Sequence, residues 1–333
     1  MSRFLLVSLI MESILREQRI AARRDRLKEM ASVLRSAYDR MLSRVKAQGE
    51  AKEEIGMAAL MWVSHSERPL KVDELCYALA VKRGSADLDP ENVPSIKTLS
   101  DCCQGLLAVD KEASTVRLVH STLRYYLSTH SDFDGRAHSA MAETCLTYLN
   151  YQEFKSPPTS ELPDPVRTPF LRYSSVYWGA HAKRELSDCA KSLALKLFND
   201  YGGHISVRLL LKHVLDPSDF NNIKGFPLFT GLHCASFFGI VEIVAALMKM
   251  EGYDADQVDC VGNTPLMWAT QNKHEEAAKL LRGRGDVTPI PCGSSHTTPL
   301  HAKRKRVEEL PPQNPAPGNA TGIRRSKRHK RGL

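Results

Sequence analysis

Thr264-Pro-Leu-Met-Trp-Ala269 is the stretch that decides the fold, because it recurs along the chain at a fixed spacing. Thr230-Gly-Leu-His-Cys-Ala235 lies 34 residues before it, and Thr298-Pro-Leu-His-Ala302 lies 34 residues after it. Other positions repeat at the same distance, such as Glu242 with Glu276 and Leu247 with Leu281. A fixed period of this length predicts stacked copies of one structural unit.

The residues of this stretch suit the helix-turn-helix unit of ankyrin repeats, whose period is about 33 residues. Thr264 is a good N-cap, Pro265 suits the first helical position, and Gly262 permits the turn before them. His233 occupies the histidine position of the pattern and is expected to bond the loop of an adjacent repeat. Each unit buries its apolar face only when a neighbour stacks on it. We therefore predict two repeats and a truncated third over residues 226–302, supported by the helices that precede them.

Residues 53–130 carry the pattern of a winged-helix domain. Apolar residues at helical spacing predict three helices, over Met57–Val63, Val72–Val81 and Val93–Leu107. Two short β-favouring runs, Leu106–Val109 and Thr115–Val119, predict a hairpin. A closing helix is expected over Ser121–Ser128.

Helical patterns flank this domain on both sides. Residues 1–52 are predicted to be N-terminal helices, with one long amphipathic helix or two over Ile20–Val45. Residues 131–225 predict an all-helical connector with a proline-rich loop. Residues 303–333 are predicted to form a disordered basic tail. The expected fold class is therefore mostly α: a helical segment, a winged-helix domain, a helical connector, a short ankyrin-repeat array and the tail.

Composition limits the function. The net charge of +8 comes from residues 301–333, which hold ten Lys or Arg against two Glu, so the rest of the chain is balanced. The eight cysteines are scattered without CxxC spacing, which suits a reducing compartment. The apolar run Phe4–Ile10 is too short to span a bilayer. We expect a cytoplasmic protein, with a nuclear location as the alternative, and no membrane partner.

Several stretches resemble fungal NACHT–ankyrin proteins of the STAND class, which are NLR-like signalling ATPases. These stretches are Met61–Cys76, Ala86–Pro94, Arg117–Leu123 and Tyr173–Ala182, and the resemblance covers roughly residues 1–285. It implies a P-loop ATPase domain followed by a winged helix, a helical segment and ligand-sensing ankyrin repeats. Residues 1–52 then correspond to the end of the NACHT ATPase-type region. No GxxxxGK[ST] occurs in the sequence, so the chain lacks the phosphate-binding loop and is not expected to hydrolyse ATP.

The resemblance also implies a nucleotide-sensing residue. In the family, a histidine at the position of His120 contacts the phosphate of bound ADP, and an imidazole N–H is suited to donate to phosphate. The alternative is a half-buried histidine that bonds the backbone. Ankyrin stacks bind partners through hairpin tips and the concave helix face, so the predicted protein-binding residues are Asp259, Cys260, Gly262 and Trp268.

Two functional classes remain open, besides an inactive chain. The first is a non-catalytic protein–protein interaction module that uses the ankyrin repeats. The second is a nuclear or nucleic-acid-associated scaffold that uses basic clusters of the tail, where a solvated tail is the simpler interpretation. The cluster residues are Lys303, Arg304, Lys305, Arg306, Arg324, Arg325, Lys327 and Arg328. The third helix of the winged helix has too few basic residues to read DNA. Because no zinc spacing, catalytic motif or cofactor motif occurs, we expect a protein partner, no enzyme activity, no cofactor and no metal.

Overall fold

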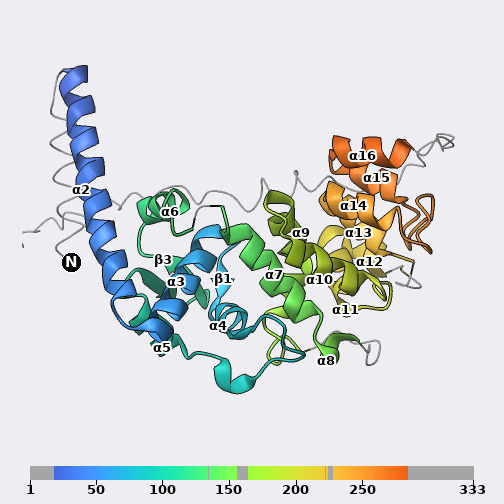
Figure 1. Cartoon of the computed structure of the whole chain (residues 1–333), viewed down its shortest axis with the longest axis horizontal. Helices are drawn as coiled ribbons and strands as arrows, with labels where there is room; N and C mark the ends of the chain where they lie inside the picture. Colours follow the sequence, from blue (N-terminus) through green and yellow to red (C-terminus); the bar gives the residue numbers. More distant parts are fainter. Residues whose placement is uncertain (1–18, 134, 156–163, 222, 224–227, 284–333) are drawn as a thin grey trace, which may run out of the picture. The chain divides into compact units, whose positions relative to one another are not determined.

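The computed structural model describes residues 19–133, 135–155, 164–221, 223 and 228–283. Over this part of the chain the protein is mostly helical with one small sheet, as the sequence predicts (Figure 1). The predicted basic tail and the Thr298–Ala302 stretch lie outside the described residues.

The winged-helix domain consists of three helices, a small sheet and a closing helix. The helices are α3 (Glu50–His65), α4 (Val72–Ala80) and α5 (Ile96–Cys102), with a 3-10 turn, η1 (Pro90–Asn92), before α5. The strands are β1 (Leu70–Lys71), β2 (Leu107–Asp110) and β3 (Thr115–Leu118), and α6 (Ser121–Ser128) closes the domain. The antiparallel order is β1-β3-β2, with Val116 of β3 opposite both Leu70 and Val109. The sequence does not predict β1, because two residues are too few to show the alternation of a strand.

One helix, α2 (Ile20–Lys46), spans the range Ile20–Val45 for which the sequence left one helix or two open. Its second half packs on α6. The rings of Tyr38 and Tyr126 lie 5.3 Å apart, and the Tyr126 hydroxyl donates to the Asp39 carboxylate at 2.5 Å. Leu42 and Val45 are buried there. The second half of α2 therefore belongs to the core of the winged-helix domain.

The helix α3 begins at Glu50, earlier than the predicted start at Met57. Gly56 lies inside it and is buried. A Cβ added at Gly56 would come within 2.8 Å of the Cys102 carbonyl oxygen. This glycine allows α3 to pass close to the end of α5 and does not interrupt the helix.

The helical connector follows as α7 (Ala137–Leu149), α8 (Gln152–Lys155), α9 (Leu171–Arg184), α10 (Asp188–Phe198), α11 (Ile205–Val214) and α12 (Pro217–Asn221). The helices α10 and α11 are separate, with Gly202 and Gly203 between them. Trp62 of α3 makes edge-to-face contacts with Phe170 and Tyr173, with ring centroids 5.5 and 5.9 Å apart. These aromatic rings form the core between the winged-helix domain and the connector.

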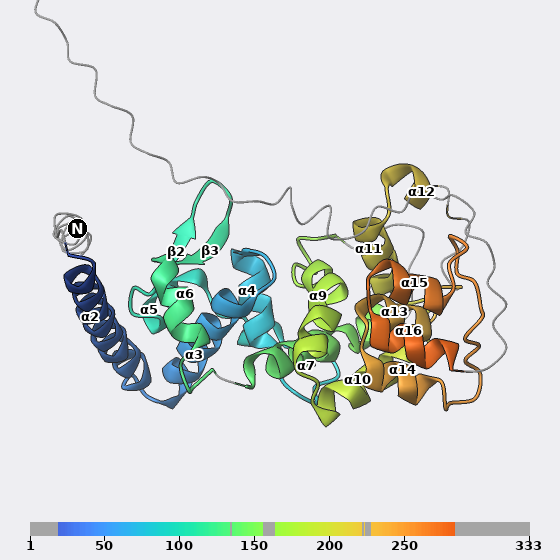
Figure 2. The same ribbon diagram turned by 90° about the horizontal axis from the view of Figure 1, so that it is seen from above.

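The ankyrin array comprises α13 (Gly231–Phe238), α14 (Val241–Leu247), α15 (Pro265–Gln271) and α16 (Glu275–Arg282). The first helices of the two repeats, α13 and α15, pack together, and so do the second helices, α14 and α16 (Figure 2). The predicted cap is confirmed: the Thr264 hydroxyl accepts the Met267 N–H at 3.2 Å, and Pro265 is the first residue of α15.

The array stacks directly on the connector, through α9 and α10. Two glycines allow this close approach. A Cβ added at Gly179 of α9 would lie 2.2 Å from the Phe238 ring, and one at Gly231 of α13 would lie 2.5 Å from the Phe198 ring. Trp178 is fully buried between Phe198 and Phe238. The connector therefore covers the face of α13 that an isolated array would expose to water.

Candidate functional site

Asp259 organises the hairpin loop that joins α14 to α15. One carboxylate oxygen, Oδ1, accepts the N–H groups of Val261 and Asn263, each at 2.9 Å. The other oxygen, Oδ2, accepts the Trp268 indole N–H at 2.6 Å. Gly262, at φ +82°, closes the turn by donating its N–H to the Asp259 carbonyl oxygen at 3.1 Å. A loop held by this many bonds from within is a rigid surface feature.

The burial of two predicted binding residues corrects the sequence-based expectation. Asp259 is 4% exposed and Trp268 is 2% exposed, so neither side chain reaches a partner. Both are internal because the indole N–H needs the carboxylate as its acceptor inside the repeat. Gly262 is exposed and Cys260 is half-buried, so these two positions remain at the surface. Burial raises the pKa of the Cys260 thiol to about 11, which keeps it protonated at neutral pH.

His233 fixes where this hairpin lies on the preceding repeat. The Thr230 N–H donates to His233 Nδ1 at 3.1 Å, so the neutral ring carries its proton on Nε2 and donates it to the Gln257 carbonyl oxygen at 2.9 Å. The predicted bond from His233 to the loop of an adjacent repeat is thus confirmed. The Phe229 ring stacks on His233 at 5.5 Å between centroids.

Two apolar side chains flank these contacts and remain in solvent. Leu228 adjoins Phe229 and is 49% exposed, and Val258 adjoins Gln257 and is also 49% exposed. The same loop exposes the carboxylates of Glu251, Asp254 and Asp256. We call Leu228, Val258 and these three carboxylates the hairpin surface; the sequence pattern alone did not distinguish its exposed positions from the buried ones.

His274 joins the second repeat to the first and to the connector. It precedes α16, donates its Nε2–H to the Phe237 carbonyl oxygen at 3.0 Å and accepts from the Lys183 ammonium of α9 at 2.9 Å through Nδ1. Gly239, at φ +71°, lies against the ring, where an added Cβ would be 2.3 Å from His274 Cγ. These contacts hold the array in a defined position on α9.

His120 lies at a separate place, in the winged-helix domain. It is the N-cap of α6: its Nδ1 accepts the Thr122 N–H at 3.2 Å, so the neutral ring carries its proton on Nε2. The residue borders a surface hollow of about 220 Å³. The hollow is lined by Val63, Pro69, Val116, Arg117, Leu118, His120, Ser121 and Arg124. Sequence reasoning did not single out Arg117, which lies in the Arg117–Leu123 stretch with His120, or Arg124, which directly follows that stretch.

The described residues hold no group of three or more His, Cys, Asp or Glu side chains arranged to bind a metal. Burial raises the pKa values of Cys76 to about 11 and of Cys103 and Cys234 to about 12, so these thiols are not nucleophilic at neutral pH.

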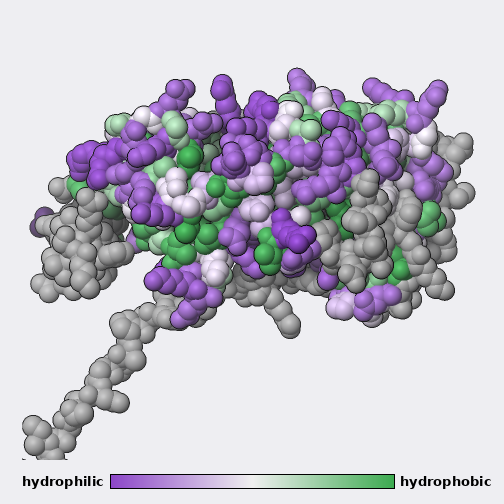
Figure 3. All heavy atoms as spheres, turned by 90° about the horizontal axis from the view of Figure 1, so that it is seen from below, coloured by the Kyte–Doolittle hydropathy of each residue, from purple (hydrophilic) through white to green (hydrophobic). Residues whose placement is uncertain are grey.

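None of the described helices has the length and apolar character needed to cross a bilayer. The face shown in Figure 3 is mainly hydrophilic, with hydrophobic residues in small separate patches. The predicted basic clusters, from Lys303 to Arg328, lie outside the described residues.

These features define a mostly helical protein in which a winged-helix domain is followed by a helical connector and an ankyrin-repeat interaction module. Two family models match it. Residues 38–140 match the winged helix domain of GPI inositol-deacylase, and residues 199–291 match ankyrin repeats in three copies. The first match begins within α2 and the second begins in the connector, just after α10. Neither a curated protein nor a solved structure gives a significant match.

Proposed function

We propose that this chain is the partner-binding part of a NACHT-type, NLR-like signalling protein, and that the hairpin surface makes the contact. The observation that carries the proposal is a loop braced internally by Asp259 and His233, which leaves the Val258 side chain exposed to solvent. A rigid loop loses little conformational entropy on binding, which favours affinity. In this role the chain is not an enzyme and uses no cofactor.

The exposed carboxylates indicate the chemistry of the partner. Glu251, Asp254 and Asp256 are exposed in the same loop as Val258 and give this loop negative charge. A matching protein surface would present apolar residues flanked by Lys or Arg, because complementary charge raises the association rate and excludes other partners.

Site-specific photo-crosslinking tests this function. A photoreactive amino acid would replace Val258 in the full chain, and in a control it would replace Val166, a valine that is 79% exposed in the connector. We expect one protein to crosslink from position 258 and not from position 166. Equal crosslinking from both positions, or capture of nucleic acid alone, would contradict the proposal and favour the alternative scaffold role of the basic tail.

We propose a second role for the hollow around His120, in which it contacts a nucleotide phosphate held by a NACHT ATPase domain. Arg117 and Arg124 line the same hollow, and guanidinium groups are well suited to phosphate. His120 carries its ring proton on Nε2, the form that donates to an anion. These residues support a positively charged site without showing its ligand.

The test adds a purified NACHT ATPase domain to the full chain and measures ADP affinity. His120→Ala and Arg124→Ala should each weaken ADP binding about tenfold, because each removes a charge-assisted contact. His213→Asn, which changes a histidine of α11, should leave the affinity unchanged. An ADP affinity that is the same in all four proteins would refute this role.

We also place the protein in the cytoplasm, with tail-directed nuclear import as the alternative. A fluorescent fusion that lacks residues 303–333 would show the same cytoplasmic distribution as the whole chain. Nuclear accumulation of the whole chain alone would favour the alternative.

A further inference from the structure

The loop between α4 and η1 carries a charge pattern that occurs once in the sequence. Two adjacent basic residues, Lys82 and Arg83, stand three and two positions before a serine, Ser85. Both basic residues are exposed, and the Arg83 side chain is 71% exposed. Residues 81–89 belong to no helix or strand, so a second protein can reach this segment without unfolding an element. Neither the hairpin surface nor the hollow around His120 uses this loop.

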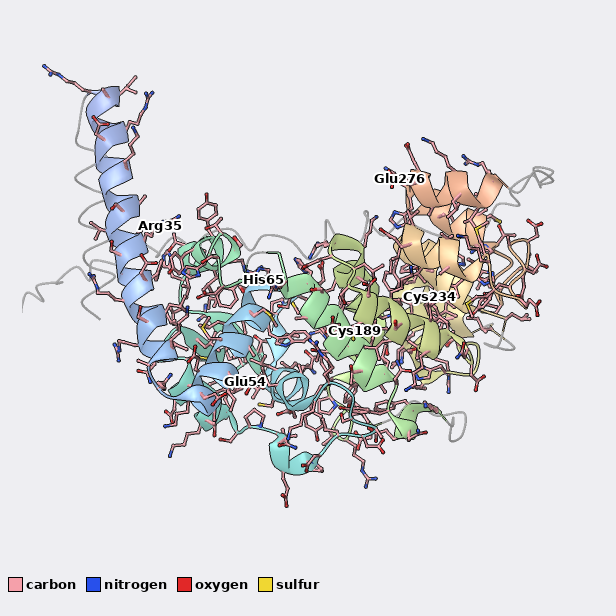
Figure 4. The ribbon with its side chains drawn as sticks, viewed as in Figure 1. Arg35, Glu54, His65, Cys189, Cys234 and Glu276 are labelled. Carbon is pink, nitrogen blue, oxygen red and sulfur yellow. The ribbon has the colours of Figure 1, made fainter. Side chains whose placement is uncertain are left out.

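The same loop joins the winged-helix domain to the connector. The Arg83 guanidinium pairs with the Glu143 carboxylate of α7 at 2.7 Å. The Gln152 N–H, at the start of α8, donates to the Ala86 carbonyl oxygen at 3.3 Å and to the Asp87 carboxylate at 3.1 Å. Figure 4 shows the segment between α4 and α5 passing beside α8. All of these bonds cross from one part of the molecule to the other.

The Ser85 hydroxyl lies at the centre of this junction. It donates its one proton to the Lys82 carbonyl oxygen at 2.7 Å. The Tyr151 hydroxyl, 3.1 Å away, is therefore the donor of the second bond, which Ser85 Oγ accepts. Burial raises the pKa of Tyr151, and the carboxylates of Asp87 and Glu153 raise it further. The Ser85 hydroxyl thus faces a tyrosine with two carboxylates beside it.

We propose that Ser85 is a phosphorylation site for an ATP-dependent serine kinase with an acidic peptide groove, and that the phosphate releases the loop from α7 and α8. Carboxylates in the groove would recognise the two cations before the serine. In the reaction, Ser85 Oγ forms a bond to the γ-phosphorus of ATP while the bond from that phosphorus to the bridging oxygen breaks. ADP leaves, and the hydroxyl proton passes to the base of the kinase.

A phosphate on Ser85 would act first on the carboxylates of the junction. The ester lacks the hydroxyl proton, so the bond to the Lys82 carbonyl oxygen is lost. The group carries a charge of about −1.5 to −2 at pH 7 and would be repelled by Asp87 and Glu153, which lie beside the Tyr151 hydroxyl that Ser85 faces. Both effects drive the loop away from α8.

The phosphate would also remove the ion pair of the loop. It competes with Glu143 for the Arg83 guanidinium, because guanidinium groups bind phosphate through charge-assisted hydrogen bonds. Once the loop has moved, the Gln152 N–H has lost its acceptors. The release concerns the loop alone, because the contacts of Trp62 with Phe170 and Tyr173 lie elsewhere and still hold the winged-helix domain on the connector.

Ser187 provides a comparison within the same chain. It also has a cation three positions before it, Arg184. Arg184, however, lies in the last turn of α9, and the Ser187 hydroxyl caps α10 by accepting the Ala190 N–H at 3.0 Å. The same hydroxyl donates to the Glu143 carboxylate at 2.5 Å. A serine held between two helices cannot enter an extended groove, so a kinase should modify Ser85 and not Ser187.

Phosphorylation of the full chain tests the site. The chain would be incubated with ATP, Mg²⁺ and a purified serine kinase that selects basic residues three and two positions before its target, and the modified residues would be mapped by mass spectrometry. We expect phosphate on Ser85, none on Ser187, and none at position 85 of the variant Ser85→Ala. A full chain left unmodified at Ser85 under conditions that modify a synthetic peptide of residues 79–90 would overturn the assignment.

Hydrogen exchange of the Gln152 amide, measured by NMR at pH 7.5, tests the release. We expect its exchange rate to rise at least about tenfold on phosphorylation and to return after phosphatase treatment. Ser85→Ala removes the hydroxyl without adding charge, so its rise should be smaller. The Trp178 amide, inside α9, should exchange alike in all samples. An unchanged rate at Gln152 after phosphorylation, or an equal rise in Ser85→Ala, would overturn the proposed release.

Discussion

Asp259 shows how one buried carboxylate shapes a surface that it does not reach. Its two oxygens accept the N–H groups of Val261, Asn263 and Trp268, which ties the hairpin backbone to the helix behind it. The residue was predicted as a partner contact, and the structure gives it an internal role. Its effect on binding would act through the shape of the loop.

Asp259→Ala should lower the free energy of unfolding of the whole chain by about 2–3 kcal/mol, because it leaves buried N–H groups without an acceptor. Asp256→Ala is the matched control: this side chain is exposed in the same loop, so its loss should change the free energy by no more than about 0.5 kcal/mol. Urea unfolding followed by tryptophan fluorescence measures both. Equal stability of the two variants would mean that the hairpin is not held from within.

The sequence could predict some residue roles and not others. The bond from His233 to the next loop follows from its fixed place in the repeat, and the structure confirms it. Trp268 shares the same repeat, yet its direction depends on an acceptor nine positions earlier in the chain, which the pattern does not show. His138 and His181 come from different helices, and no local pattern indicates that they touch.

At the scale of elements, the junction between connector and array depends on helices that approach very closely. Gly179 lies in the middle of α9, where alanine would favour the helix by about 1 kcal/mol. An added methyl group would, however, lie 2.2 Å from the Phe238 ring, which is far inside contact distance. Overpacking of this kind costs about 1–3 kcal/mol, so the clash outweighs the gain in helix propensity.

Gly179→Ala should therefore lower the melting temperature of the chain, and Gly231→Ala should do the same through its clash with Phe198. Gly203→Ala is the control, because a Cβ at Gly203 meets nothing within 4 Å. Calorimetry of the three variants measures the effect. A Gly179→Ala variant as stable as Gly203→Ala would show that the array does not pack on α9 as described.

Elements whose apolar residues recur at a regular spacing could be predicted from the sequence, whereas short or irregular elements could not. The helices of both repeats and the closing helix α6 follow directly from caps and apolar spacing. The strand β1 is too short for such a signal, and α3 begins before its predicted start at Met57 and includes Gly56. Close packing with α5 explains this glycine, and such contacts are not visible in a single sequence.

At the scale of the whole molecule, neutral buried histidines should make stability depend on pH. Burial lowers the pKa of His204 to about 4, as it does for His138, and lowers that of His181 to about 3. The unfolded chain binds protons at the ordinary value of 6.5, so below that pH it holds more protons than the folded chain. The contribution of these neutral histidines to the free energy of unfolding is therefore complete above about pH 6.5 and is lost as the pH falls towards 4.

The melting temperature should therefore be constant from pH 8 to 7 and fall steadily between pH 6.5 and 4.5. Thermal unfolding followed by circular dichroism in buffers of equal ionic strength measures this. A melting temperature that rises on acidification would mean that these histidines are charged in the folded protein.

The molecule as a whole combines a supported array with an exposed loop. The connector completes the core that two repeats lack, and Asp259 and His233 hold the loop that presents Val258. The central claim is that this loop binds a protein partner.

The most direct test is the affinity of the crosslinked partner for two variants of the full chain, measured by calorimetric titration. Val258→Asp places a charge on the hairpin surface, and Val166→Asp makes the same change at an exposed site in the connector. We predict that Val258→Asp weakens binding at least about tenfold, or about 1.4 kcal/mol, while Val166→Asp binds as the wild type does. Unchanged affinity of Val258→Asp would contradict the account.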